Sequence, residues 1–260
     1  MEWRDPRSLI RAAPELGDRI ALFLDFDGTL VDISDIPQQT AAPLSLAPVL
    51  NRLASALNGA LAIVSGRTIS DLDHRLAPYR GPAAGVHGAE LRLRRDDVVE
   101  REIAPLDSEI VAHIRALTAF DPRLIVEDKG VSVTVHYRRA PELGPRIQRD
   151  MEAFVGSAPG ALRLLHGRMV VEILGAAFSK GQAVELFMRS PPFLGRRPVM
   201  IGDDRTDVSA FDACRLLNGG GLRVAGEFFS AYHAEFSDPQ AVREWLAAMA
   251  TRMPIATETN

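Results

Sequence analysis

Short apolar runs alternate along the chain with longer segments in which apolar residues follow a helical pattern. Three of the runs are Ile20–Leu24, Leu61–Val64 and Val199–Ile201, and a polar residue follows soon after each. Strands of a parallel sheet that is buried on both faces have this nearly continuous apolar character. The pattern therefore predicts an α/β fold, and the carboxyl ends of its strands, where such folds bind ligands, should converge on one crevice.

The pattern changes between residues 106 and 174. Two helices are predicted there, together with four strands that include the alternating segment Val131–Tyr137; the helices are Leu106–Phe120 and Pro141–Val155, and the other strands lie near Leu124–Glu127, Leu162–Leu165 and Met169–Ile173. We expect a small α+β module inserted into a larger domain, so that residues 1–105 and 175–260 form a core and residues 106–174 form the insertion. Further helices are predicted at Lys180–Met188 and Pro239–Met249.

Composition narrows the class of protein. Apolar residues make up 47% and charged residues 25% of the 260 positions, which is ordinary for a soluble globular chain. The net charge of −4 comes without a basic run, so we expect no nucleic-acid partner. The longest uncharged stretches fall short of the ~20 residues that cross a membrane. Cys214 is the only cysteine, which excludes an intrachain disulfide. We expect a cytoplasmic monomer with no membrane partner.

Lysine is rare in this chain. Of the 30 basic residues, only Lys129 and Lys180 are lysine, and each precedes a glycine. Codon bias in a GC-rich genome explains an excess of arginine, but it does not explain the exceptions. Because the planar guanidinium cannot always replace a compact ammonium, these two positions are candidates for sites that need a point charge.

Two acidic motifs follow predicted strands. In Asp25-Phe-Asp-Gly-Thr29, the carboxylates of Asp25 and Asp27 are two residues apart, so extended backbone points both to one side. A calcium loop also begins Asp-x-Asp, but its twelfth position would be Ile36 instead of glutamate, and no helix precedes it. A chance acidic turn is the other alternative for this motif taken alone.

Gly202-Asp-Asp-Arg-Thr-Asp207 adds three carboxylates after another strand, those of Asp203, Asp204 and Asp207. Asp204 and Asp207 also suit the start of a helix, where a carboxylate caps backbone N–H groups. Five carboxylates in one crevice raise one another's pKa unless a hard divalent cation neutralises them. A donor set made only of oxygen suits Mg²⁺.

Four ordered motifs, Asp25-x-Asp-x-Thr29, Ser65, Lys180 and Gly202-Asp-Asp-x-x-Asp207, resemble those of the haloacid dehalogenase superfamily. Within it the chain resembles the trehalose-6-phosphate phosphatases over nearly its whole length; the supporting segments are Ile63-Val-Ser-Gly-Arg67, Gly85-Val-His-Gly-Ala-Glu90, Lys129-Gly130, His136-Tyr-Arg138, His166-Gly-Arg-Met-Val-Val-Glu172 and Ser179-Lys-Gly181. The resemblance implies a Rossmann-like core with a parallel sheet and an inserted α+β cap domain that is mobile.

The resemblance also implies roles for the motif residues. Asp25 would attack phosphorus to form an aspartyl phosphate, and Asp27 would first protonate the leaving oxygen and then activate water. Ser65 and Lys180 would hold the phosphoryl oxygens. Mg²⁺ would be bound by Asp25, Asp203 and the backbone carbonyl of Asp27, within the acidic set that includes Asp204 and Asp207. A helix N-cap is the alternative for Ser65, and a solvated helix start is the alternative for Lys180.

The substrate-binding candidates are Thr29 and Arg67 in the core and three residues of the insertion, Lys129, His136 and Glu172. Glu172 next to an apolar strand can accept two hydrogen bonds from sugar hydroxyls. The alternative for Glu172 is an outward-facing strand residue, and His136 fits a solvent-facing strand position equally well. Arg67 can pair with an acid instead of substrate. His87 fits a core histidine beneath a loop and is left outside the catalytic set.

Two positions depart from the family pattern. Leu174-Gly175 stands where the family usually has a basic residue and proline, and Val208 stands where it usually has glutamate. The expected function is hydrolysis of trehalose 6-phosphate to trehalose and phosphate. Sucrose phosphate and mannosylphosphoglycerate are alternative substrates, a phosphomutase is an alternative enzyme, and a catalytically silent sugar-phosphate sensor is an alternative from another class.

Overall fold

The structure is a computed structural model that describes residues 5–33, 41–101, 106–158, 161–167, 169–175 and 178–254. The chain forms two compact units. The first combines residues 1–100 with 179–260, and the second comprises residues 101–178. The domain boundaries expected after residues 105 and 174 stay a prediction, and the two units are described separately.

A seven-stranded sheet forms the centre of the first unit, in the order β11-β10-β1-β2-β3-β4-β5. Its strands are β1 (Ile20–Leu24), β2 (Leu61–Val64), β3 (Ala83–Gly85), β4 (Glu90–Arg92), β5 (Glu100–Arg101), β10 (Arg197–Gly202) and β11 (Gly220–Arg223). The strands from β11 to β3 run parallel, and β4 is antiparallel to β3. The predicted α/β fold with a parallel sheet is confirmed.

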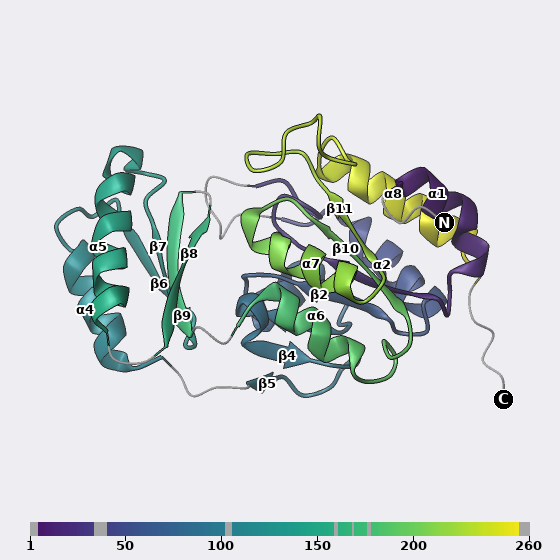
Figure 1. Cartoon of the computed structure of the whole chain (residues 1–260), viewed down its shortest axis with the longest axis horizontal. Helices are drawn as coiled ribbons and strands as arrows, with labels where there is room; N and C mark the ends of the chain where they lie inside the picture. Colours follow the sequence, from purple (N-terminus) through teal and green to yellow (C-terminus); the bar gives the residue numbers. More distant parts are fainter. Residues whose placement is uncertain are drawn as a thin grey trace. The chain divides into compact units, whose positions relative to one another are not determined.

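Helices surround this sheet and explain its apolar strands. They are α1 (Pro6–Ala12), α2 (Leu46–Ala56), α3 (Ile69–Leu76), α6 (Lys180–Met188), α7 (Val208–Leu216) and α8 (Pro239–Arg252), with short 3₁₀ turns at Ala13–Glu15, Val86–Gly88 and Arg205–Asp207. In Figure 1, α6 and α7 lie in front of the sheet and α2 lies behind it. Every residue of β1 and β2 is buried, as strands covered on both faces require.

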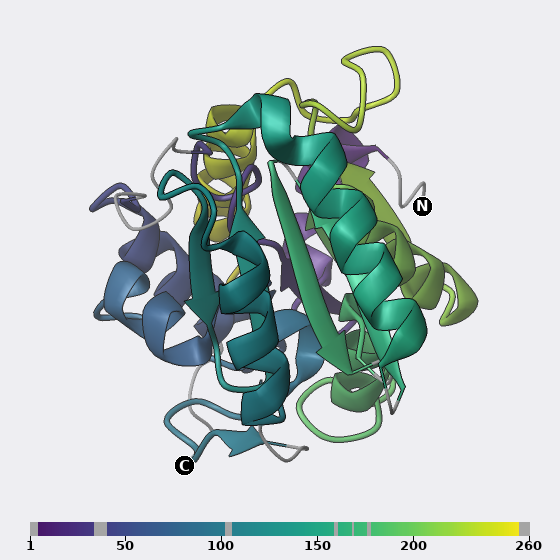
Figure 2. The ribbon, with the colours of Figure 1, turned by 90° about the vertical axis from the view of Figure 1, so that its left-hand side faces the viewer.

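The second unit is an antiparallel sheet with two helices. Its strands, in the order β6-β7-β9-β8, are β6 (Ile125–Asp128), β7 (Ser132–His136), β9 (Val170–Gly175) and β8 (Leu162–Gly167). Both α4 (Ser108–Thr118) and α5 (Gly144–Ser157), which follows a 3₁₀ turn at Pro141–Leu143, lie on one face of this sheet (Figures 1 and 2). The predicted α+β composition of the insertion is therefore present.

The alternation along β7 explains how this second sheet is covered. Val133 and Val135 pack in an apolar cluster with Ile114 of α4 and Ile147 of α5. Successive side chains of a strand point to opposite faces, so Ser132, Thr134 and His136 lie on the face away from these helices. Across the described parts of both units, no helix is long and apolar enough to cross a lipid bilayer.

Candidate active site

The three strands whose ends carry the acidic and serine motifs are neighbours. Strand β1 lies between β10 and β2, and Leu24 is paired with both Ile201 and Ile63. Since these strands are parallel and in this register, Asp25, Asp203 and Ser65 all emerge at the same edge of the sheet. The convergence expected from the sequence is thus found in the fold.

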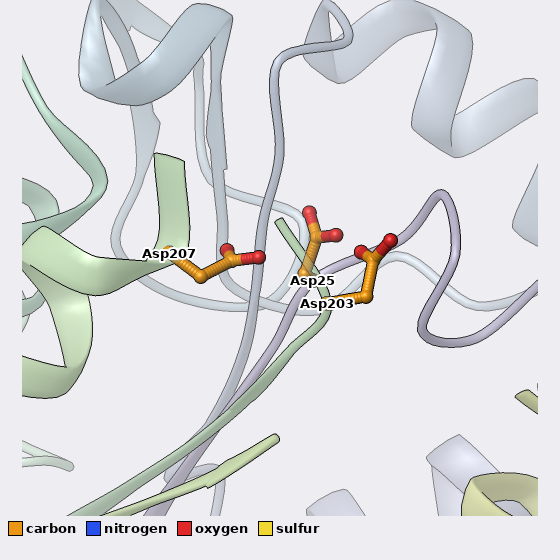
Figure 3. A group of neighbouring side chains, drawn as sticks. All are labelled: Asp25, Asp203 and Asp207. Atoms are coloured by element: carbon orange, nitrogen blue, oxygen red, sulfur yellow. The ribbon is translucent and has the colours of Figure 1, made fainter. Parts of the chain in front are cut away.

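Three carboxylates meet at this edge. Oxygens of Asp25, Asp203 and Asp207 lie within 4.8 Å of one another, and all three residues are buried. Figure 3 shows the Asp25 carboxylate between those of Asp203 and Asp207. Of the other two candidate ligands, Asp204 is outside this group of carboxylates. Asp27 is expected to bind through its backbone carbonyl, and its carboxylate is bound by arginine, as described below.

Lys180 supplies a positive charge to this group. Its Nζ donates to Asp25 Oδ1 at 2.7 Å and to Asp207 Oδ1 at 2.6 Å. Lys180 is the first residue of α6, whose N-terminus is capped by the hydroxyl of Ser179. The side chain is only 3% exposed, which rules out the solvated helix start as the explanation of this lysine.

The electrostatics of the group favour a divalent cation. Burial raises the pKa of Asp203 to about 7, and the nearby Asp207 carboxylate adds to the shift. Burial likewise raises the pKa of Asp25, whereas the ammonium of Lys180 opposes this change. When the three carboxylates of this group are all ionised, the Lys180 ammonium balances one of them and two negative charges remain, which a divalent cation would neutralise. The buried, oxygen-only donor set fits Mg²⁺.

Thr29 and Gly28 bring the Asp25–Thr29 motif close to Asp203, which follows β10. The Thr29 hydroxyl lies 3.3 Å from Asp203 Oδ1 and 3.5 Å from Asp25 Oδ2, and the residue is fully buried. Thr29 therefore orients carboxylates in this structure, although we expected it to bind substrate. Gly28 has a φ of 76°, and a Cβ there would lie 2.0 Å from Asp203 Oδ2. A side chain at position 28 would displace the Asp203 carboxylate.

Ser65 lies directly after β2 and is 1% exposed. Its backbone N–H donates to the carbonyl of Ala84 at 2.9 Å, and its Oγ accepts from the backbone N–H of Arg67 at 3.2 Å. The N-cap of α3 is Thr68, whose side chain accepts from the N–H of Asp71. Capping of this helix is therefore excluded as the reason for a serine at position 65.

Arg67 binds the second carboxylate of the first motif. Its Nε and Nη2 each lie 2.6 Å from an oxygen of Asp27, so the ion pair is bidentate. Nη1 donates to Asp71 at 2.7 Å, and Asp71 also accepts from Arg75. Burial raises the pKa of the Asp71 carboxyl, but the hydrogen bonds from Arg75 and Arg67 outweigh it and leave this pKa lowered. In this structure Arg67 contacts acids, the alternative that the sequence left open.

Asp204 occupies the start of a 3₁₀ turn. Its backbone N–H donates to Asp207 Oδ2 at 2.9 Å, so one oxygen of Asp207 caps the turn while the other binds Lys180. Burial raises the pKa of the Asp204 carboxyl as well. Its assignment as a metal ligand stays a prediction, and the geometry of the acidic group favours Asp203 and Asp207. Val208, one of the two departures from the family pattern, is the first residue of α7 and is 37% exposed.

In the second unit, the predicted substrate residues share one face of the sheet. Thr134 is paired with both Glu127 and Glu172, so these three side chains point the same way. Ser132 Oγ donates to Glu172 Oε1 at 2.6 Å, and Lys129 Nζ lies 3.3 Å from the same oxygen. Glu127 is not among the substrate-binding candidates named from the sequence. The signal available for it was its place at the end of the predicted strand Leu124–Glu127, two residues before Lys129.

His136, the remaining candidate of this unit, pairs with Glu127. The Nε2 atom of His136 lies 2.8 Å from Glu127 Oε2. This hydrogen bond is the largest influence on Glu127 and lowers the pKa of its carboxyl.

Replacing Glu127 by Gln should destabilise the protein near pH 7 and have little effect at low pH. The folded-state pKa of Glu127 is lowered, so its contribution to stability is present above the unfolded value of about 4.3 and lost as the pH falls through the folded value. Thermal unfolding of both proteins between pH 3 and 7 measures this, with an expected difference of about 2 °C at pH 7. A difference that persisted unchanged at pH 3 would contradict the prediction.

Comparison with known proteins fits the geometry at the strand ends. A model of the trehalose-phosphatase family matches residues 23–241, which include the whole acidic group and the insertion. The chain belongs to the trehalose-phosphatase family. It is therefore a phosphatase, and its substrate is a sugar phosphate. The resemblance to the trehalose-6-phosphate phosphatases, drawn from the supporting segments of the sequence, is confirmed.

Named trehalose-phosphate phosphatases resemble this chain over 90–95% of its length. A probable trehalose-phosphate phosphatase of Sinorhizobium fredii is 41% identical over 236 residues, which cover 90% of this chain and 88% of that protein. The trehalose-6-phosphate phosphatase of Escherichia coli is 36% identical, with 95% and 92% covered. The solved C-terminal domain of C. albicans trehalose-6-phosphate phosphatase has a TM-score of 0.82 at 21% identity and covers 95% and 97%, which shows the shared fold.

Proposed function

We propose that this phosphatase hydrolyses trehalose 6-phosphate to trehalose and inorganic phosphate in a Mg²⁺-dependent reaction that passes through an aspartyl phosphate. The observation that carries the proposal is the buried Asp25 carboxylate, which Lys180 contacts at 2.7 Å among the acids at the strand ends. A carboxylate placed beside an ammonium is a nucleophile that needs no activating base.

In the first half of the reaction, Asp25 attacks phosphorus, and an oxygen–phosphorus bond forms as the bond to the sugar oxygen breaks. A sugar alkoxide leaves poorly, so Asp27 donates a proton to that oxygen. For this step Asp27 must leave its ion pair with Arg67 and carry a proton. The Lys180 ammonium and the Ser65 hydroxyl bind the phosphoryl oxygens and stabilise the charge that develops on them. In the second half, Asp27 accepts a proton from the water that attacks the aspartyl phosphate, and Asp25 and phosphate are released.

Mg²⁺ would be held by Asp25, Asp203 and the backbone carbonyl of Asp27, with Asp207 and Asp204 nearby, and when bound it would neutralise charge on the phosphoryl oxygens. Lys180 keeps two of the acids, Asp25 and Asp207, in fixed orientations. The Thr29 hydroxyl orients Asp203. These contacts preorganise the carboxylates before substrate arrives.

Two observations support trehalose 6-phosphate as the substrate. Relatives that are 36–41% identical over 90–95% of the chain are named trehalose-phosphate phosphatases. The polar face of the second sheet, with Glu127, Lys129, His136 and Glu172, offers both donors and acceptors to sugar hydroxyls. Leu174 and Gly175, where the family pattern differs, end strand β9 of the same sheet.

The deciding experiment measures phosphate release by purified protein from a panel of sugar phosphates, with Mg²⁺ and with a chelator. We expect kcat/KM to be highest for trehalose 6-phosphate, and activity to disappear with chelator and return with Mg²⁺. Preference for sucrose phosphate or mannosylphosphoglycerate would overturn the substrate assignment but leave the proposed aspartyl-phosphate mechanism in place. Conversion of one sugar phosphate to its isomer without phosphate release would identify a phosphomutase instead. The cytoplasmic location and monomeric state stay predictions.

Lys129→Arg should lower kcat/KM about tenfold for trehalose 6-phosphate and leave nitrophenyl phosphate hydrolysis nearly unchanged. The compact ammonium beside Glu172 is replaced by a wider, planar group that cannot keep the same contacts, and the aryl phosphate has no sugar hydroxyls to bind. Arg149→Lys, the reverse exchange at an exposed position of α5, is the control. Equal losses on both substrates would show that Lys129 acts on folding or on the phosphoryl chemistry.

A further inference from the structure

The turn at Val86–Gly88, directly after β3, has an unusual backbone. The φ angles of Val86, His87 and Gly88 are 47°, 56° and 105°, so three consecutive residues adopt left-handed conformations. Val86 and His87 are also buried. A β-branched residue is strained in this conformation, and such strain persists only where the surrounding structure fixes the backbone.

One side of this turn holds the loop after β2. The backbone N–H of Val86 donates to the carbonyl of Arg67 at 2.9 Å, and that of His87 donates to the carbonyl of Ser65 at 3.0 Å. The imidazole of His87 lies over Gly66, where a Cβ would be 2.7 Å from Nε2. His87 is also close enough to Asp204 to interact with it electrostatically. The turn therefore determines the path of the Ser65–Arg67 backbone.

The other side of the turn packs on the N-terminus of α6. A Cβ at Gly88 would lie 3.1 Å from the carbonyl oxygen of Ser179 and 3.3 Å from the Cβ of Ala183. Ser179 caps α6 and directly precedes Lys180. The turn thus touches both segments from which Ser65 and Lys180 project, although these segments are far apart in the sequence.

We propose that the Val86–Gly88 turn is a positioning element that fixes the separation between Ser65 and Lys180, so that both bind the same phosphoryl group. This inference rests on the proposed function, which assigns the phosphoryl oxygens to these two residues. His87 and Gly88 act through their neighbours: His87 constrains the peptide after Ser65, and Gly88 sets how closely α6 approaches. The left-handed backbone lets one short turn make both contacts.

Gly88→Ala tests the contact with α6, and Gly195→Ala is its matched control. Gly195 also has a positive φ, of 79°, but no atom lies within 4 Å of a Cβ placed there. Both variants incur backbone strain, and Gly88→Ala should lose more thermal stability because its Cβ also crowds the start of α6. Gly88→Ala alone should raise about tenfold both the KM for nitrophenyl phosphate and the inhibition constant of inorganic phosphate, because small displacements of binding groups are costly.

His87→Asn tests the contact with the loop. Asparagine tolerates a left-handed backbone, so this variant keeps the conformation and removes the ring over Gly66. We expect weaker inhibition by inorganic phosphate, with His74→Asn at an exposed position of α3 as the control. This readout distinguishes positioning from folding, because a purely structural role would lower the melting temperature and leave the phosphate affinity of the folded protein intact.

Ser65→Ala distinguishes a failure of the positioning role from a failure of the proposed function. If Ser65→Ala weakens phosphate inhibition while both Gly88→Ala and His87→Asn leave it unchanged, the positioning role is overturned and the proposed function stands. If Ser65→Ala has no effect on phosphate inhibition, the assignment of Ser65 to the phosphoryl group fails, and the positioning role fails with it. If Gly88→Ala and Gly195→Ala weaken phosphate inhibition equally, the positioning role is also overturned.

Discussion

Asp25→Asn should fold normally and lose at least about 10³-fold of its turnover on both trehalose 6-phosphate and nitrophenyl phosphate. An amide is not a nucleophile, so no aspartyl phosphate forms. Folding should be retained because the substitution removes one of three neighbouring carboxylates, and Lys180 keeps its partner Asp207 at 2.6 Å. Steady-state turnover, thermal unfolding and acid trapping of a covalent phosphoenzyme measure these effects.

Asp32→Asn is the matched control, since it makes the same change at an exposed carboxylate in the segment that follows the motif. It should retain full activity. Retention of a tenth of the wild-type turnover by Asp25→Asn would refute the assignment of the nucleophile. Asp27→Asn, in contrast, should still form the aspartyl phosphate from nitrophenyl phosphate, whose leaving group needs no proton.

Lys180→Arg should lower hydrolysis of sugar and aryl phosphates alike by about 10²-fold or more. The ammonium is 3% exposed and lies 2.7 Å from Asp25 and 2.6 Å from Asp207, so a guanidinium cannot enter without moving both acids. Lys129→Arg, the same substitution at the other lysine, is the control, and it should affect only the sugar phosphate. A loss confined to the sugar phosphate in Lys180→Arg would show that Lys180 does not bind the phosphoryl group.

Lys180→Met tests how much the positive charge of Lys180, as distinct from the volume of its side chain, contributes to stability. Removing the ammonium leaves the buried carboxylates of Asp25 and Asp207 without their partner, a change that costs about 3–5 kcal/mol of stability. Burial raises the pKa of Asp203 to about 7 in the folded wild-type protein and the ammonium of Lys180 opposes this shift, so its removal raises this pKa further above the unfolded value of about 3.9. Stability linked to a raised carboxyl pKa is present at low pH and lost as the pH rises, so the variant loses more of it than the wild type does. Unfolding in chelator should therefore show a larger loss at pH 8 than at pH 5, and a loss independent of pH would contradict this account.

Long apolar runs and charged motifs were sufficient to predict much of the fold from the sequence. Ile20–Leu24 and Leu61–Val64 form strands with the predicted bounds because each is a continuous apolar run that must be covered on both faces. The three-residue β3, Ala83–Gly85, lacks such a signal, because small residues are equally compatible with a loop. Its place beside β2 depends on long-range pairing that no local pattern records.

The residues of the candidate site that directly follow predicted strands could be predicted from the sequence. Asp25, Asp203 and Ser65 follow neighbouring strands, so pattern and topology together locate them. The partners of Thr29 and Arg67 were not predictable, since they depend on side-chain distances between different segments. The left-handed turn at His87 was also missed, because two non-glycine residues with positive φ have no sequence signature.

The pairing of β1 with β10 has a consequence for synthesis on the ribosome. Residue Ile20 is paired with Arg197, so β1 lacks one neighbour until the whole insertion and α6 have emerged. Such a non-local contact forms late, because loop closure must precede it. A nascent chain that stops within the insertion exposes the apolar edge of β1, where unpaired backbone groups promote aggregation. Lys180 also follows the insertion in the chain, so its ammonium and the Asp25 carboxylate meet only late in the folding of the core.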